Sequence, residues 1–292
     1  MRAAPHRNGA PRNREQAFGR IACFLIEEHP VLNMNVIRTA ITRLVTATLC
    51  AVTAPMLPAH AADASAPASA APADHAFDYD HQRDWHLESG DAQSPVAIDA
   101  STARQATRYA DENNAIGMHI ADTRAKAIDN GHTIQIVPAV GSATIRGRHF
   151  TLQQIHFHSP SEHTIDGRNY PIEGHFVFRA QDGRLAVVAV LYRTGAENAQ
   201  FAAAMDALKA GDTASLSSFR AAALMPGNMN IYYHYLGSLT TPPLTENVEW
   251  YVLDEPVELS AEDITAFRMR YSHNARVVQP LNGRPLLRYD AR

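Results

Sequence analysis

Short runs of β-branched and aromatic residues, separated by turn residues, make up most of the chain beyond about residue 130. Runs of this kind are typical of strands. The stretch over residues 185–191 is continuously apolar, as expected of a central strand that is buried on both faces. The pattern predicts strands over residues 133–140, 151–158, 175–179, 184–193, 231–236 and 247–253.

Two segments have helical spacing instead. Residues 197–210 place their apolar side chains on one stripe and end at Gly211. Residues 260–271 begin with Ser260 and Asp263, which form a capping box. Because strands outnumber helices and no repeat divides the sequence, we expect one β-dominated α/β domain.

Residues 34–61 have the features of a secretory signal peptide: a basic start, an apolar run and a small-x-small cleavage site. Residues 1–33 show no apolar periodicity and are expected to lie upstream of the true start or to be disordered. The apolar run is short and contains Pro55 and Pro58, whereas a membrane anchor needs about 20 apolar residues. We therefore expect cleavage, release into the periplasm and no membrane anchor.

Residues 62–75 are rich in Ala, Pro and Ser, which predicts a linker before a domain over residues 76–292. The chain of 292 residues is 46% hydrophobic and has 26 basic and 30 acidic side chains. Removal of residues 1–61 takes away seven Arg and three Glu, so the net charge becomes about −8. This charge disfavours nucleic acid as a partner. Both cysteines, Cys23 and Cys50, precede the cleavage site, so the exported protein has no thiol.

Histidines recur with strand spacing at two places. Alternation along a strand sends Gln154, His156 and His158 to one face. On a second strand, Glu173 and His175 share a face in the same way. In both cases a group that can orient an imidazole stands two residues before the histidine.

This arrangement predicts a possible metal site. A metal-bound imidazole needs a carboxylate or amide on its other nitrogen. Three neutral nitrogen ligands leave a fourth tetrahedral position open, as in catalytic zinc sites. However, a His-x-His pair on a strand is more often two solvated or hydrogen-bonded side chains. From these residues alone, both interpretations stay open.

Longer motifs resemble those of the alpha-class carbonic anhydrases. Residues 154–163 (QIHFHSPSEH) and 173–175 (EGH) look like the zinc signature of that family, and residues 237–244 (GSLTTPPL) look like its active-site wall. The resemblance extends over residues 77–284 and implies a mixed α/β, β-dominated domain on a large, mostly antiparallel twisted central sheet with short peripheral helices. Further matches, in family order, are Gln93-Ser94-Pro95, Asn130-Gly131-His132, Leu185-Ala186-Val187, Trp250 and Gln279-Pro280-Leu281-Asn282.

The resemblance implies a Zn²⁺ enzyme that converts carbon dioxide and water to bicarbonate and a proton. Thr240 would accept a hydrogen bond from the zinc-bound hydroxide and donate its own proton to Glu162. His132 would shuttle the proton, although a histidine after Asn-Gly is by itself more often a surface residue in a turn. Sulfonamides and anions would inhibit. The implied zinc ligands are His156, His158 and His175, supported by Gln154, Glu173 and Asn274, while Asn130 and Tyr79 would order water. The residues implied to line the substrate pocket are Val177, Val187, Leu239, Thr241, Val248 and Trp250. Ordinary core packing explains each apolar residue of this set equally well.

Several positions depart from the family pattern. Glu88 and Leu244 stand where exported members have a disulfide, so we expect packing and hydrogen bonds to hold that loop. Gly174 replaces a larger apolar residue, Phe178 stands where a histidine is common, and Phe77 where a tryptophan is usual.

Two other classes of protein fit part of the sequence. His156-x-His158-x3-Glu162 fits half of a cupin metal motif, which would predict an iron or manganese oxygenase with Glu162 as a ligand. A second Gly-rich motif ending in histidine, which a cupin needs, is absent from the sequence. A non-catalytic binding domain of the same fold typically lacks a ligand histidine, whereas all three are present here.

Overall fold

The computed structural model describes residues 77–85, 90–106 and 115–290. The upstream segment, leader and linker predicted over residues 1–75 lie outside these residues and stay predictions. None of the described helices is long and apolar enough to cross a membrane.

Strands dominate the described residues, and most of them are short. The strands are β1 (Ala97–Ile98), β2 (Arg104–Gln105), β3 (Ile116–His119), β4 (Thr123–Asp129), β5 (Ile134–Pro138), β6 (Ser142–Ile145), β7 (Arg148–His158), β8 (Thr164–Ile165), β9 (Ile172–Arg179), β10 (Leu185–Thr194), β11 (Thr213–Phe219), β12 (Ile231–Ser238), β13 (Glu246–Leu253), β14 (Val257–Leu259) and β15 (Leu287–Asp290). The helices are α1 (Ala199–Ala207) and α2 (Ala261–Arg270), with 3₁₀ turns at Gln82–Asp84, Leu208–Ala210 and Ala221–Leu224.

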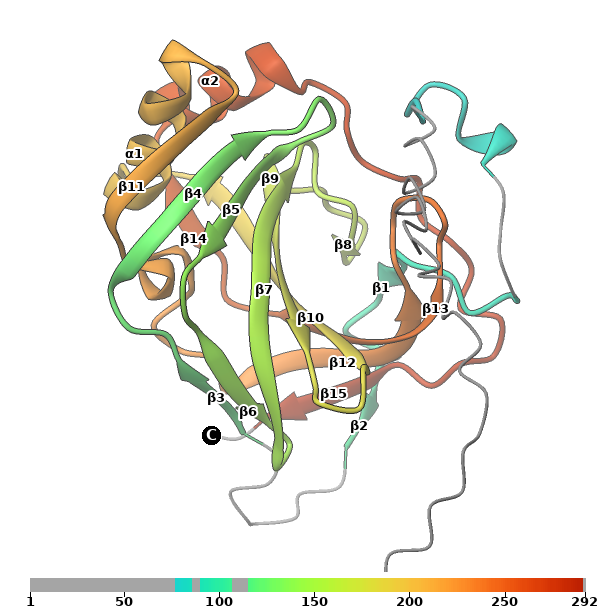
Figure 1. Cartoon of the computed structure of the whole chain (residues 1–292). Helices are drawn as coiled ribbons and strands as arrows, with labels where there is room; N and C mark the ends of the chain where they lie inside the picture. The colour runs from blue at the N-terminus through green and yellow to red at the C-terminus, as the bar shows by residue number, and fades with distance from the viewer. Residues whose placement is uncertain (1–76, 86–89, 107–114, 291–292) are drawn as a thin grey trace, which may run out of the picture. The chain divides into compact units, whose positions relative to one another are not determined.

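A large twisted sheet forms the body of the domain (Figure 1). Its main path runs β11-β4-β5-β7-β9-β10-β13-β12-β15-β2, while β1 and β8 pair separately. Most neighbours are antiparallel, but β10 runs parallel to β13 and β14, and β15 runs parallel to β2. The predicted fold class is confirmed, and each of the six predicted strands is present.

A bulge in β7 decides which face its side chains occupy. The register of β7 against β9 shifts between Leu152 and Gln154. Leu152 before the bulge and Phe157 after it both lie in the larger core cluster. Because side chains alternate along a strand, His156 and His158 would share the face of Leu152 if the strand were regular. The extra residue turns both histidines to the opposite face.

The two sheet faces bury different groups. The helices cover one face, where Phe201 of α1 and Phe267 of α2 contact the Phe157 ring, with centroids 5.0 Å and 6.3 Å away. The side chain of Asn198 accepts hydrogen bonds from the first turn of α1, so this helix begins after it, two residues later than predicted. Ser260 caps α2 in the same way. The other face carries the histidines.

Candidate metal centre

Three histidines converge from two neighbouring strands. β7 and β9 place His156 directly opposite His175, with His158 two residues further along β7. The ring centroids are 4.9 Å apart for His156 and His158, 5.0 Å for His156 and His175, and 4.6 Å for His158 and His175. One nitrogen from each ring lies within 4.8 Å of the other two. The sheet thus gathers nitrogen donors around one point.

The outer nitrogen of each ring has an oxygen acceptor. Two acceptors come from the same strand as their histidine, two residues earlier, and the third comes from a distant loop. The acceptors are Gln154 Oε1 for Nδ1 of His156 (2.9 Å), the backbone carbonyl of Asn274 for Nδ1 of His158 (2.7 Å) and Glu173 Oε1 for Nε2 of His175 (2.8 Å).

The inner nitrogens fit a zinc ion. A neutral imidazole that donates through its outer nitrogen has a lone pair on the inner one. Nε2 of His156 and Nδ1 of His175 lie 3.3 Å apart, so two lone pairs face each other with no proton between them. Two nitrogens bound at about 2.0–2.1 Å to one tetrahedral zinc would lie about 3.3–3.4 Å apart. Nε2 of His158 is buried and has no hydrogen-bond partner in the described part of the chain.

Burial keeps the three rings neutral. It lowers the pKa of His158 to about 4, and it also lowers the pKa values of His156 and His175. Neighbouring imidazoles add to this effect in His156 and His175. Neutral rings are the form that binds a metal, so the ligand set is available without loss of protons from the rings.

A buried hydrogen-bonded chain extends behind His175. Oε1 of Glu173 is shared between Nε2 of His175 and Nδ1 of His163, at 2.8 Å and 2.7 Å. Nε2 of His163 lies 2.8 Å from the hydroxyl of Tyr235, which donates to Ser94 at 2.9 Å. Burial alone would raise the pKa of Glu173, but the two histidines bring it well below its usual value. His163 and Ser94 stand inside the quoted motifs, but only the folded sheet brings them together, so no local sequence pattern indicates their contacts.

Glu162 and Thr240 are both buried, and Glu162 lies beside His158 and His175. Oε1 of Glu162 accepts the backbone N–H of Arg276 at 2.8 Å and lies 3.4 Å from Nδ1 of His158. Burial raises the pKa of Glu162 to about 7, and the Thr240 hydroxyl opposes this rise. Oε2 of Glu162 has no hydrogen bond of ordinary geometry to any described residue, so the hydrogen bond from Thr240 to Glu162 stays a prediction.

An apolar wall borders the histidines. Val187 on β10 pairs with Val177 on β9 and with Trp250 on β13, and the Trp250 ring centroid lies 4.9 Å from that of His175. Val248 and Leu239 belong to the same apolar cluster. Thr241 follows β12 in the loop and is half-buried. These residues are therefore brought together, as both the pocket and the core interpretations require.

His132 lies in a turn at the edge of this region and is half-buried. Oδ1 of Asn130 accepts the backbone N–H of His132 at 3.0 Å, and Nδ2 of Asn274 donates to the His132 carbonyl at 3.0 Å. The ring stacks on Phe77, with centroids 4.1 Å apart and planes inclined by 13°. Tyr79 packs edge-on against Phe77, and burial raises its pKa. Phe77 thus fills one side of the His132 ring.

Gly174 leaves room for aromatic packing behind the centre. A Cβ atom there would lie 3.0 Å from Tyr192 and 3.1 Å from Phe157. Both rings are buried, and the Tyr192 hydroxyl donates to the Leu224 carbonyl at 2.7 Å. Because Gly174 has no side chain, the rings of Tyr192 and Phe157 can pack closely against its backbone, and no gap is left.

Hydrogen bonds join the segments around Ala92 and Glu246, near the two positions where the resemblance implies a disulfide in exported members. Oε1 of Glu246 accepts the backbone N–H of Ala92 at 2.7 Å and Nε2 of Gln93 at 3.1 Å. Leu244 is fully buried. Glu88 lies outside the described residues, but the segment after it is fastened as expected.

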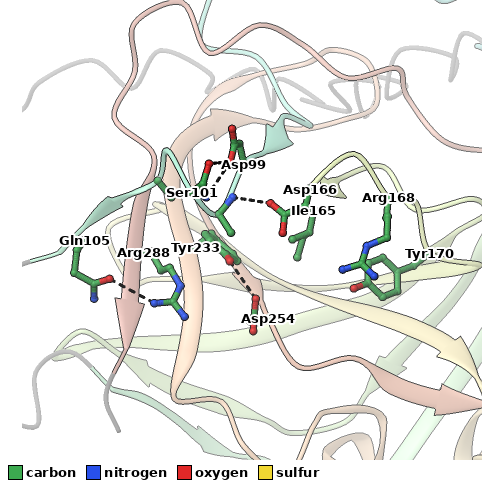
Figure 2. A pocket seen from close by; sticks show the side chains of 12 residues that line it. Asp99, Ser101, Gln105, Ile165, Asp166, Arg168, Tyr170, Tyr233, Asp254 and Arg288 are labelled. Atoms are coloured by element: carbon green, nitrogen blue, oxygen red, sulfur yellow. Dashed lines mark hydrogen bonds between the residues drawn. The ribbon is translucent and has the colours of Figure 1, made fainter.

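A separate hollow of about 680 Å³ lies away from the histidines (Figure 2). Side chains of both charges line it, and none of the predicted site residues is among them. Tyr233 donates to Asp254 within it at 3.1 Å. The hollow is therefore not part of the candidate centre.

Glu162 also bears on the cupin alternative. Its carboxylate lies on the side of the outer nitrogen of His158, away from the point where the inner nitrogens converge. A cupin would need this carboxylate as a metal ligand, and its strands would form a jelly-roll barrel. The position of Glu162 and the large open sheet both disagree with that alternative.

Known proteins share this architecture. Residues 80–290 match the family model of eukaryotic-type carbonic anhydrases. A carbonic anhydrase of Pectobacterium carotovorum is 42% identical over 207 residues, which cover 68% of this chain and 81% of the relative. The alpha-carbonic anhydrase from Thermovibrio ammonificans in complex with the inhibitor sulfanilamide aligns with a TM-score of 0.62 at 35% identity, over 68% of this chain and 87% of that one. A carbonic anhydrase from Chlamydomonas reinhardtii in complex with acetazolamide gives 0.62 at 29% identity, over 68% and 91%.

Proposed function

The chain belongs to the eukaryotic-type, or alpha-class, carbonic anhydrases, and on this premise we propose that it is a zinc enzyme that interconverts carbon dioxide and bicarbonate. The observation that carries the proposal is the pair of inner nitrogens on His156 and His175, 3.3 Å apart with no proton to share. A cation is the group that satisfies such an arrangement. His156, His158 and His175 would hold Zn²⁺, which when bound lowers the pKa of a coordinated water toward neutrality.

The protein's own residues would orient the nucleophile. The Thr240 hydroxyl would donate its hydrogen bond to the Glu162 carboxylate, so that Thr240 has only lone pairs to offer and would accept a hydrogen bond from the attacking group. Gln154, Glu173 and the Asn274 carbonyl fix the ligand rings. Carbon dioxide has no charge, so the wall formed by Val177, Val187, Leu239, Thr241, Val248 and Trp250 would receive it.

His132 would accept the proton that hydration releases. An imidazole titrates near neutral pH, which suits proton exchange with buffer. Asn130, in the same turn as His132, and Tyr79, whose ring contacts Phe77, would order water along the path. This role belongs to the proposal and is supported by the position of His132 at the edge of the site.

The proposal extends to inhibitors and location. Sulfanilamide and acetazolamide bind the two solved relatives, and we propose that sulfonamides and small anions inhibit this enzyme in the same way. Residues 34–61 would direct the chain to the periplasm and would be removed there by cleavage.

Stopped-flow measurement of carbon dioxide hydration by the purified protein tests the function. We expect activity that a zinc chelator removes, that added zinc restores and that sulfanilamide inhibits. Metal analysis of the same sample should give one zinc per chain. A zinc-loaded, folded protein without hydration activity would contradict the proposal, and it would favour a binding protein of the same fold.

A further inference from the structure

We propose that Asp129 is a positioning residue for His132, because its carboxylate ties the turn that carries His132 to the end of α2. The inference rests on the proposed role of His132 as proton acceptor. Asp129 is the last residue of β4, and the turn over residues 130–133 follows it directly.

Three donors converge on the Asp129 carboxylate. Nη1 of Arg270 donates to Oδ2 at 2.6 Å, and the Tyr271 hydroxyl donates to Oδ1. The backbone N–H of Gly131, within the turn itself, donates to Oδ1 at 3.3 Å. Nη2 of Arg270 also donates to the Leu208 carbonyl at 2.8 Å, so the guanidinium is fixed from two sides.

The ion pair of Asp129 and Arg270 is largely shielded from solvent. The Asp129 side chain is 14% exposed and that of Arg270 is 29% exposed. Burial works to raise the pKa of Asp129, but the hydrogen bonds from Tyr271 and Arg270 bring it below its usual value. Hydrogen bonds to an ionised acceptor are stronger than those between neutral groups. The carboxylate can therefore hold its partners in a defined geometry.

The same short segment holds the turn from its other side. Nδ2 of Asn274 donates to the His132 carbonyl at 3.0 Å, three residues after Tyr271. Gly131 has a φ of 83°, a conformation that suits a glycine in a tight turn. Its N–H is the one that Asp129 accepts. Loss of the carboxylate would release the residue next to His132 while leaving the Asn274 contact in place.

Proton transfer depends on this placement because the imidazole must meet an ordered path of water. A shift of about 1 Å in a positioned group can cost up to about 100-fold in rate. Asp129 forms no hydrogen bond to any of the three ligand histidines, so its effect should fall on proton transfer alone. The kcat/KM for carbon dioxide hydration, which does not include proton export, should not change.

The test compares Asp129→Asn with Asp122→Asn. Asp122 lies just before β4, at the end of the strand opposite to Asp129, and forms an ion pair with Arg220 at 3.1 Å. The control therefore also removes a carboxylate that pairs with an arginine. In dilute buffer we expect Asp129→Asn to lower kcat by about three- to tenfold, with kcat/KM unchanged. Added imidazole should restore kcat. Combined with His132→Ala, Asp129→Asn should cause no further loss. The control should behave as the unaltered enzyme does.

Three results would overturn the inference. One is a kcat of Asp129→Asn that equals that of the control. Another is a loss that appears in kcat/KM or persists with imidazole, which would indicate a structural role. A third is a normal kcat for His132→Ala, which would reject the shuttle itself and leave zinc-dependent hydration untouched. If Asp129→Asn does not fold, Tyr271→Phe removes one donor and should lower kcat in the same buffer-dependent way.

Discussion

The backbone carbonyl of Asn274 lies 2.7 Å from Nδ1 of His158, although 116 positions separate the two residues. The contact fixes the ring and directs Nε2 of His158 toward the other two histidines. That nitrogen is buried and without a partner among the described residues. A buried polar atom in this state costs free energy unless a ligand satisfies it.

Substitution His158→Ala should abolish tight zinc binding. Two nitrogens from His156 and His175 would remain, and a two-ligand site falls short of the three protein ligands of catalytic zinc. Metal analysis after dialysis measures the result. His149→Ala is the matched control, because His149 lies on the same strand but is exposed. Normal zinc content in His158→Ala would remove His158 from the ligand set.

Substitution Thr240→Ala should retain zinc but lower the hydration rate by about 100-fold, because the nucleophile loses the acceptor that orients it. Thr240→Ser keeps the hydroxyl and should recover most of the activity. Stopped-flow hydration and metal analysis on the same preparations separate orientation from metal loss. Equal rates for Thr240→Ala and the unaltered enzyme would contradict the link between Thr240 and Glu162.

Substitution Gly174→Leu should lower the free energy of unfolding by about 1–3 kcal/mol, because the new side chain meets the rings of Tyr192 and Phe157. Gly211→Leu serves as the control, since nothing lies within 4 Å of a Cβ at Gly211. Urea unfolding followed by fluorescence compares the two. Equal stability of both variants would show that the aromatic packing behind the centre tolerates a larger residue.

Acid should weaken the pair that Glu249 forms. Its hydrogen bond with His234 is the main cause that lowers the pKa of Glu249 to about 2, and Arg184 adds to it. A lowered carboxyl pKa stabilises the fold above the unfolded value near 4.5, and this contribution is lost as the pH falls toward 2. Glu249→Gln should therefore cost about 1–2 kcal/mol at pH 7.

The measurement is thermal unfolding of Glu249→Gln and the unaltered protein across pH. The difference in free energy of unfolding between the two proteins should be constant above about pH 5 and should shrink between about pH 4.5 and 2. A difference that grows in acid would contradict a lowered pKa of Glu249 in the folded protein.

Expression in a bacterium should deliver the protein to the periplasm with its N-terminus near Ala62. Cell fractionation and N-terminal sequencing measure this. A variant without residues 34–61 should stay in the cytoplasm. Recovery of the full-length chain from the cytoplasm would contradict the predicted leader.

Sequence pattern predicted the strands that are rich in β-branched and aromatic residues and missed those that are not. β4 and β11 contain mainly Ala, Ser, Thr and charged residues. They form because they pair with each other, and β4 also pairs with β5. Such strands depend on their neighbours more than on their own composition. No local window could have revealed them.

In the candidate site, contacts between residues close in sequence could be predicted, and contacts between distant segments could not. Alternation along a strand predicted that Gln154 would stand beside His156 and Glu173 beside His175, since each pair is two residues apart. The contacts of Arg276 with Glu162 and of Tyr235 with His163 join segments that are distant in sequence. Arg276 acts there through its backbone N–H, a group that every residue except proline carries. Side-chain identity could not have indicated it.

The bulge in β7 makes the metal centre depend on a count of residues rather than on their kind. Deletion of Gln153 would restore unbroken alternation of side chains along β7. Either the imidazoles or the apolar side chains before the bulge would then have to move to the opposite face of the sheet. A change that removes one polar, exposed amino acid could thus erase catalysis while altering no chemically active group. Insertions and deletions in this strand should be tolerated only in pairs.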